Sequence, residues 1–175
     1  MSKIKFQFFF LPFFVILQAQ EATPIAFLEF NKNEYYQKQI RKLKKTNVKD
    51  YDLVLIDSIV ELAFTYKDWE TSIDYSEKAI KIKPNAKRFY LLGGAAGFRA
   101  LEVSILSSLK YINIMKPAFE KALELEPNNP LFLRAQVDVL ISLPSIIGGN
   151  IEKAKKLATQ IKLINLLEGL IACLL

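Results

Sequence analysis

Two phrases in this chain nearly repeat each other: EKAIKIKPNA runs from Glu77 to Ala86, and EKALELEPNN runs from Glu120 to Asn129. In both, alanine and larger apolar residues recur every three or four positions, which is the spacing of one helical face. A proline then follows, and proline disfavours helix at the preceding residue and lacks the N–H that a continuing helix needs. Each phrase is therefore expected to end a helix, and their similarity indicates one structural unit used more than once.

A second apolar stripe precedes the first phrase, so each unit is expected to be a pair of helices. The sequence TYKD would form the turn between them, with Asp68 capping the next helix and Glu70 adding favourable charge near its N-terminus. The stripe consists of Leu53, Ile56, Ile59, Val60 and Ala63.

The stretch YKDWETSIDYSEKAIKIKPNA, Tyr66 to Ala86, resembles the second half of a tetratricopeptide repeat, a helix–turn–helix unit of about 34 residues. The matching positions here are Trp69, Ser72, Ala79 and Pro84, and in the next unit Leu92, Gly93, Phe119, Ala122 and Pro127. A third unit starts at Asn129-Pro130, with Ala154 and Ala158 in its second helix. The resemblance implies an all-α solenoid of about three helical hairpins, at residues 51–86, 87–128 and 129–165.

Two stretches depart from the family pattern. Pro84 and Pro127 are 43 positions apart, and the extra length around residues 98–116 predicts lengthened helices, with Asn113 capping a helix whose first turn or just beyond contains Pro117. LPSIIGGN, at residues 143–150, lengthens the turn of the third unit, where glycines permit unusual backbone angles and Asn150 can cap the next helix. An anion site at the glycine pair is the alternative, although no Walker-type Lys-Ser/Thr follows it.

Residues 1–20 read as a secretory signal peptide, because Lys3 and Lys5 precede a Phe-rich run, Phe6 to Leu17, that ends at Gln-Ala-Gln. This run has 12 residues, whereas a membrane span needs about 20. Cleavage after Ala19 or Gln20 would release an exported protein, periplasmic or secreted. The Gly-Gly turn also resembles exported bacterial tetratricopeptide proteins, including periplasmic subunits associated with some solute transporters, which favours a bacterial periplasm.

The two ends of the array are less regular than its centre. Residues 21–50 are expected to form a helical N-terminal cap or a degenerate half-repeat. Residues 166–175 are expected to form an apolar C-terminal helix with no second helix after it, as in a truncated fourth repeat. That helix either docks on the third unit, marks a shortened chain, or pairs two chains in a homo-oligomer. A membrane span there is disfavoured because the run is short and contains Glu168.

The charge distribution argues against a nucleic-acid partner. The chain carries 24 basic and 18 acidic residues, and without the two lysines of the predicted signal peptide the formal charge falls from +6 to +4. Both signs are interspersed along the chain, unlike the one-sided patch of a nucleic-acid binder. The densest basic stretch is KQIRKLKK, Lys38 to Lys45, which is either a solvated helix face or a site for an acidic partner or an anionic lipid.

The residue inventory argues against an enzyme, a cofactor and a metal site. The sequence contains no histidine, the commonest general base and metal ligand, and so no Ser-His or Cys-His nucleophile. Cys173 is the only cysteine, so no intramolecular disulfide can form. We find no dinucleotide-binding fingerprint, zinc-ligand spacing or calcium loop.

We therefore expect a non-catalytic interaction module that binds a peptide or protein segment in the concave face of the superhelix. The family's groove positions, transferred by repeat register, predict a partner-binding set of Asp57, Glu61, Phe64, Lys87, Tyr90, Phe98, Arg134, Asp138 and Ile141. These residues could instead be surface or packing residues. The alternative function is a transport-accessory or small-solute-binding protein, with a pocket near Phe89, Tyr90 and Phe98 in the lengthened middle hairpin.

Overall fold

The computed structural model describes residues 25–45, 52–164 and 166. The predicted signal peptide at residues 1–20 and nearly all of the predicted C-terminal helix at residues 166–175 lie outside these ranges. Within them the chain is helical and contains no strand, which confirms the all-α prediction. The elements are α2 (Ile25–Lys45), α3 (Leu53–Thr65), α4 (Trp69–Ile82), α5 (Ala86–Glu102), α6 (Ile105–Leu125), α7 (Pro130–Ser142), a short 3₁₀ helix (Ser145–Ile147) and α8 (Ile151–Ile164).

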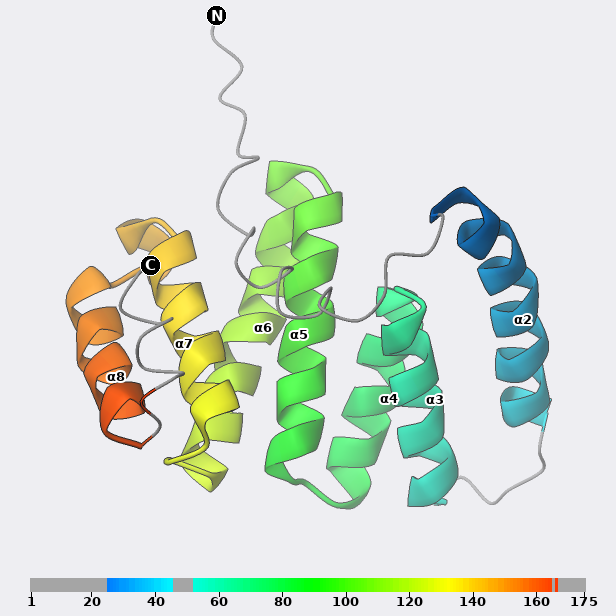
Figure 1. Ribbon diagram of the computed structural model, residues 1–175, viewed down its shortest axis with the longest axis horizontal. Coiled ribbons are helices and arrows are strands. Elements are labelled where there is room, and N and C mark those ends of the chain that lie inside the picture. Colours follow the sequence, from blue (N-terminus) through cyan, green and yellow to red (C-terminus); the bar gives the residue numbers. More distant parts are fainter. Residues whose placement is uncertain (1–24, 46–51, 165, 167–175) are drawn as a thin grey trace, which may run out of the picture.

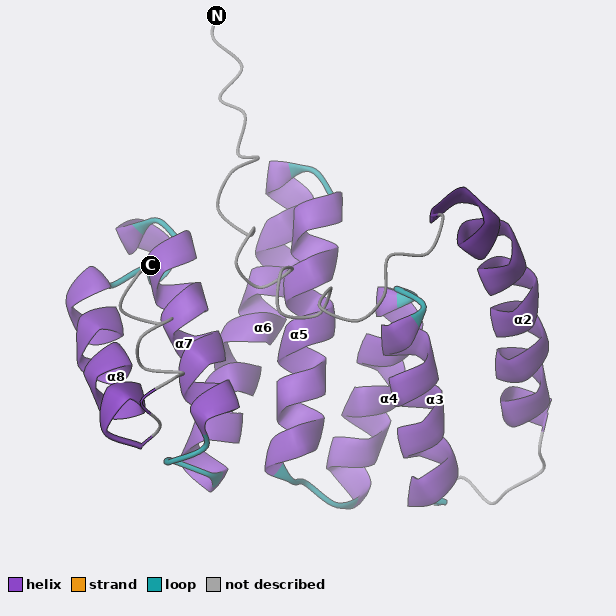
Figure 2. Cartoon of the chain, in the orientation of Figure 1, coloured by secondary structure: helices purple, strands orange, loops and turns teal. Residues whose placement is uncertain are grey.

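The helices stand beside one another in chain order, from α2 at one end to α8 at the other (Figure 1). Neighbours along the chain pack in pairs, α3 on α4, α5 on α6 and α7 on α8, and α4 packs on α5 and α6 on α7. Short loops join these helices (Figure 2). In the view of Figure 1, α4 and α6 lie behind α3 and α5. Helix α3 also contacts α5, and the ring of Tyr90 on α5 packs on that of Phe132 on α7, so the first helices of successive pairs are neighbours.

Side chains cap the helices where the sequence predicts it. Asp68 accepts a hydrogen bond from the backbone N–H of Thr71 (3.1 Å), and Asn129 accepts one from Leu131 (3.0 Å) with Pro130 as the first helical residue. Helix α4 ends at Ile82 and α6 at Leu125, each two residues before the proline that was expected to stop it. These helix ends confirm the predicted ends of the two repeated phrases.

The start of the second helix in the middle pair differs from the prediction. Helix α6 begins at Ile105, where Ser104 caps it, so Asn113 lies within the helix and is not its cap. Pro117 also lies inside α6. Pro117 removes only one backbone donor, the one that would bond to the carbonyl of Asn113. Because Asn113 is exposed, water can bond to that carbonyl instead, and the helix continues. The predicted lengthening is confirmed, since α5 has 17 residues and α6 has 21, against 13 and 14 for α3 and α4.

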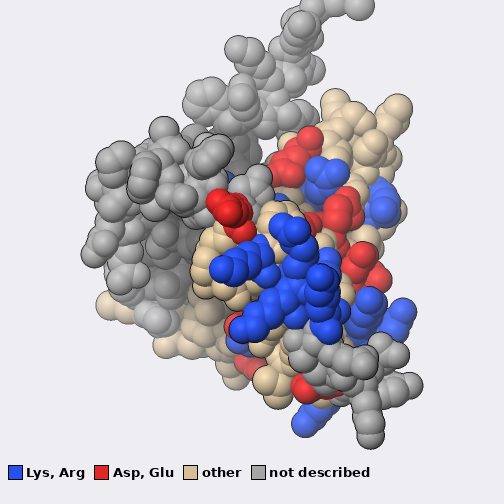
Figure 3. All heavy atoms as spheres, turned by 90° about the vertical axis from the view of Figure 1, so that its right-hand side faces the viewer, with Lys and Arg blue, Asp and Glu red and all other residues tan. Residues whose placement is uncertain are grey.

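Helix α2 packs on α3 at one end of the row. Tyr36 and Ile40 are buried in this contact, and the ring of Tyr36 stacks on Tyr66 with centroids 5.3 Å apart. The hydroxyl of Tyr36 donates a hydrogen bond to Asp68, which links α2 to the cap of α4. The other side of α2 is basic and exposed, and it forms much of the end of the molecule shown in Figure 3.

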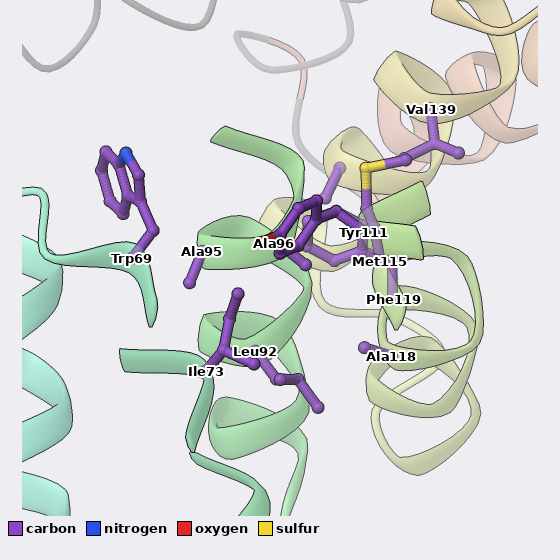
Figure 4. Packing of buried hydrophobic residues seen from close by; sticks show 11 residues of the cluster. Trp69, Ile73, Leu92, Ala95, Ala96, Tyr111, Met115, Ala118, Phe119 and Val139 are labelled. Atoms are coloured by element: carbon purple, nitrogen blue, oxygen red, sulfur yellow. The ribbon is translucent and has the colours of Figure 1, made fainter. Parts of the chain in front are cut away.

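The largest core cluster joins α4, α5, α6 and α7 (Figure 4), and includes Trp69, Ile73, Leu92, Met115 and Phe119. A Cβ atom on Gly93 would lie 2.8 Å from Cδ1 of Phe119, closer than a real contact, so the approach of α5 to α6 requires glycine there. Ala79 and Ala122, the matching alanines of the two phrases, have no exposed surface. Small residues at these positions therefore allow neighbouring helices to pack closely.

The turn between α7 and α8 is well ordered by hydrogen bonds. Gly148 has a φ angle of +112°, a left-handed conformation that favours glycine, as predicted. The ammonium of Lys116 on α6 donates to the carbonyl of Ile147 (2.8 Å), and Asn150 caps α8 by accepting from the N–H of Lys153 (2.9 Å). The long turn is thus held against the middle pair.

Candidate functional site

The nine predicted partner-binding residues all lie on the first helices of the three pairs, α3, α5 and α7. The structure divides them into four groups: a charged link between α3 and α5, an aromatic cluster, a buried polar group on α5 and α7, and a single apolar residue next to α8. Only the first and third groups place unlike charges next to each other.

The charged link between α3 and α5 contains Asp57, Glu61 and Lys87 of the predicted set. Asp57 accepts two hydrogen bonds from Arg88, at 2.8 Å from Nε and 2.6 Å from Nη2. Arg88 also donates through Nη1 to the backbone carbonyl of Lys83, so each of these guanidinium nitrogens has a partner. Lys87 pairs with Glu61 at 2.5 Å, and both side chains are more than half exposed.

The aromatic cluster contains Phe64 and Phe98. Both rings contact Trp69, with centroid distances of 5.4 Å for Phe64 and 4.9 Å for Phe98, where the two rings are stacked. The indole N–H of Trp69 donates to Glu102 at 2.7 Å. Both phenylalanines pack against the main core cluster, so much of their ring surface is covered by other residues of the chain.

The buried polar group consists of Tyr90, Arg134 and Asp138, here named the Arg–Asp site. Nε of Arg134 lies 3.3 Å from Oδ1 of Asp138, one turn along α7, and the two side chains are only 7% and 14% exposed. Among the residues that the structure describes, neither Nη1 of Arg134 nor Oδ2 of Asp138 has a hydrogen-bond partner, and both atoms are buried. Most buried polar atoms in folded proteins have a partner, so the site contains one unpaired donor and one unpaired acceptor.

The electrostatics of the Arg–Asp site follow from its burial. Burial raises the pKa of the Asp138 carboxyl to about 6, although the charge and hydrogen bond of Arg134 act in the opposite direction. Burial also raises the pKa of the Tyr90 hydroxyl, and the negative charge of Asp138 adds to the effect. The ring of Tyr90 packs on Phe132 with centroids 5.1 Å apart. The site thus combines a cation, a carboxyl and a phenol at the contact of α5 with α7.

Ile141 lies apart from these groups, in the apolar cluster between α7 and α8. The aromatic residues of the alternative solute pocket are also separated. Phe89 and Tyr90 pack near Phe132, whereas Phe98 stacks on Trp69. Tyr90 and Phe98 both also pack against the main core cluster, so these rings are used in core packing.

Two residues with polar roles were not singled out from the sequence. Arg88 completes the charged link. Gln136 is buried on α7, on the opposite side of the helix from Arg134 and Asp138, and its Oε1 atom has no partner among the described residues. The only available signal for Gln136 was a polar residue within the largely apolar stretch from Phe132 to Leu140. For Arg88 the amino-acid sequence carried no signal, because its partner Asp57 belongs to the preceding helix pair.

Residues 25–45, 52–164 and 166 contain no group of three His, Cys, Asp or Glu residues placed to hold a metal ion. In the part of the chain that the structure describes, no helix combines the length and apolarity needed to cross a membrane. Compared with protein-family models and with curated proteins, the sequence gives no match to either. The arrangement of the Arg–Asp site offers hydrogen-bond recognition, because it combines a fixed donor with a fixed acceptor.

Proposed function

We propose that this chain is a tetratricopeptide-like solenoid that binds a peptide or protein segment, without catalysis, along the surface formed by α3, α5 and α7. The pairwise packing of α3 with α4, α5 with α6 and α7 with α8 supports this fold, as does the glycine at the close approach of α5 to α6. Stacked helix pairs of this kind present an extended surface made by the first helix of each pair.

The observation that carries the proposal is a buried donor and a buried acceptor in the Arg–Asp site that have no partner among the described residues, and a peptide segment reaches them only when the side chains over the site move aside. Nη1 of Arg134 can donate a hydrogen bond and Oδ2 of Asp138 can accept one. A peptide group supplies the complementary pair, since its carbonyl accepts and its N–H donates. Leaving either atom unpaired in a buried place costs about 1–3 kcal/mol, so a ligand that satisfies both gains affinity from them.

The neighbouring groups would extend recognition beyond a single peptide bond. Tyr90 offers a hydroxyl and an aromatic ring at the Arg–Asp site, and the exposed pair of Lys87 and Glu61 lies farther along, toward α3. An extended segment with mixed charge matches this surface better than a uniformly charged one. An exported location, most simply the bacterial periplasm, is part of the proposal and rests on the residues of the predicted signal peptide.

The test is selection of peptides from a random display library on the purified chain, followed by affinity measurement for the selected peptides. Arg134→Gln combined with Asp138→Asn removes both charges but keeps side chains of similar size. We expect the selected peptides to bind this double variant at least about tenfold more weakly, which corresponds to 1.4 kcal/mol. Far-UV circular dichroism should show unchanged helicity.

A matched control uses Lys121→Gln combined with Glu124→Gln. These residues form an ion pair on α6, also within one turn of a helix, but both are solvent-accessible. The control should bind the selected peptides as the native chain does. If the library yields no specific peptide, or if the two double variants lose affinity equally, the Arg–Asp site does not bind peptides and the proposed function fails.

A further inference from the structure

The basic stretch of α2 has no role in the proposed peptide-binding surface, and its geometry is specific. With 3.6 residues per turn, Lys38, Arg41 and Lys45 lie on the side of the helix opposite Tyr36 and Ile40, which are buried against α3. All three side chains are exposed. We call these three residues the basic face of α2.

The charge of the basic face is not neutralised by the described part of the protein. Within those ranges Lys38, Arg41 and Lys45 form no ion pair, whereas acidic partners are found for Lys87, Arg88, Arg99 and Lys155. Glu34, one turn earlier on α2, is the nearby acidic residue on this side of the helix. Nε of Arg41 donates a hydrogen bond to the backbone carbonyl of Gln37, at 2.9 Å, which leaves the charge of the guanidinium unpaired within the described residues.

Further cations border the basic face. Lys44 and Lys78, from α2 and α4, both lie over the ring of Tyr75, at 5.5 Å and 4.3 Å from its centroid. These contacts place two more ammonium groups near the basic face, one from α2 itself and one from α4. Lys42 on α2 is also exposed. Figure 3 shows the resulting group of basic side chains on the end of the molecule.

We infer that the basic face of α2 binds the surface of an anionic lipid bilayer through its phosphate and carboxylate headgroups. Helix α2 stands at the end of the row, so its outer side is open to a flat surface (Figure 1). Lipid headgroups move laterally, and they need no fixed spacing of the cations. Tyr35 is exposed next to the basic face, and tyrosine with lysine and arginine is typical of a membrane interface.

The contact is electrostatic and superficial. The apolar side of α2 is occupied by α3, so α2 has no free apolar face to insert among the acyl chains. Each lysine or arginine near an anionic bilayer contributes about 1 kcal/mol, and the contribution falls off within a Debye length. Binding through this face must therefore weaken strongly as the salt concentration rises.

The test measures cosedimentation of the full chain with two kinds of vesicle, phosphatidylcholine alone and phosphatidylcholine mixed with phosphatidylglycerol. Residues 1–20, with Lys3, Lys5 and the Phe-rich run, are the same in every variant, so the difference between variants isolates the contribution of α2. We expect a clear preference in low salt that disappears in high salt. The variant Lys38→Gln, Arg41→Gln, Lys45→Gln should reduce the affinity for anionic vesicles about tenfold or more.

The matched control is Lys153→Gln, Lys156→Gln, Lys162→Gln on α8, at the other end of the row. These three lysines are exposed and form no ion pair within the described residues, but Lys162 lies on the other side of the helix from Lys153. The control changes the net charge equally and should keep the preference. A second variant, Lys38→Gln with Arg41→Gln, spares the last turn of α2, where basic residues favour the helix end.

Three results would overturn the inference. One is an equal affinity of the native chain for the two kinds of vesicle. Another is the same loss of preference in the α2 and α8 variants, which would assign the effect to net charge. The third is binding to a duplex oligonucleotide that the α2 variant abolishes while vesicle binding stays unchanged, which would make the partner a nucleic acid.

Discussion

The two ends of the proposed binding surface use charge in different ways. At the α3–α5 end, Arg88 donates two hydrogen bonds to Asp57 in a bidentate pair, and the Asp57 side chain is 40% exposed. At the α7 end, Arg134 and Asp138 make one longer contact of 3.3 Å and are buried. Nη1 of Arg134 and Oδ2 of Asp138 have no hydrogen-bond partner among the described residues. The first pair has the geometry of a structural link. The second has unused hydrogen-bonding capacity, which is why we assign recognition to it.

The largest expected effect comes from breaking the buried pair by Arg134→Met at a pH well above 6, because the loss of Arg134 raises the pKa of the Asp138 carboxyl further. This change leaves the Asp138 carboxylate buried without its cation, and removing one partner of a buried pair costs about 3–5 kcal/mol. We expect the free energy of unfolding, measured by urea denaturation, to fall by that amount.

A second variant separates the charge effect from a packing effect. In Arg134→Met combined with Asp138→Leu, no charge remains buried, and such replacements are often neutral or stabilising. The double variant should therefore recover most of the lost stability. A double variant as unstable as Arg134→Met would mean that the side chain of Arg134 acts through packing and that the buried charge of Asp138 is not the cause.

The next effect is a pH dependence due to Asp138. Its carboxyl has a pKa of about 6 in the folded chain because it is buried, against about 3.9 in an unfolded chain. Between these values the folded chain holds the extra proton, so stability falls as the pH rises from about 4 to about 6. The loss is at most about 3 kcal/mol, and it is complete above pH 6.

Asp138→Asn isolates this contribution. The stability of the native chain relative to the variant should decrease across that pH window and be constant outside it. Asp68 and Glu70 act in the opposite direction at lower pH, because hydrogen bonds in the folded chain lower the pKa of both carboxyls. A difference between native chain and variant that does not change with pH would show that Asp138 is solvated like an ordinary surface carboxylate.

Arg88→Met removes the cation of the Asp57–Arg88 pair, at the α3–α5 end of the surface. Asp57 then loses its partner but is partly exposed, so water replaces the lost hydrogen bonds. We expect a loss of about 1–2 kcal/mol in the free energy of unfolding, smaller than that of Arg134→Met. Equal losses for the two substitutions would remove the contrast between the two ends.

The smallest effect is expected for Glu61→Gln. Glu61 and Lys87 are both well exposed, and ion pairs of this kind contribute about 0–1 kcal/mol. Urea denaturation should show a change within about 0.5 kcal/mol that shrinks further in high salt. A larger loss would mean that this pair holds α3 on α5 in a way that its exposure does not indicate.

Much of the helical pattern was predictable from local chemistry. Asp68, Asn129 and Asn150 act on backbone groups within a few residues, so their capping roles follow from the sequence alone. The same local reasoning was wrong at Asn113, where α6 passes through Pro117 without a new start. A helix of 21 residues packed along α5 can lose one hydrogen bond and continue, and sequence reasoning gave too much weight to that loss.

The candidate site was predictable only in part. The repeat register placed Tyr90, Arg134 and Asp138 on first helices, and the structure brings these three together. Phe64 and Phe98 came from the same register but pack on Trp69, and Ile141 packs toward α8. The repeat register predicts the helix face on which a residue lies. What its side chain contacts depends on the residues of the neighbouring helix.

By itself the sequence determined the helical class and most of the helix ends, because caps, prolines and apolar spacing act over a few residues. Only the tertiary structure decided that Arg88 pairs with Asp57 across about thirty positions, and that burial leaves Arg134 and Asp138 each with an open atom. It also decided that Lys38, Arg41 and Lys45 face outward without acidic partners in the described chain. Pairing and burial depend on helices that are distant in sequence, and local patterns carry no record of them.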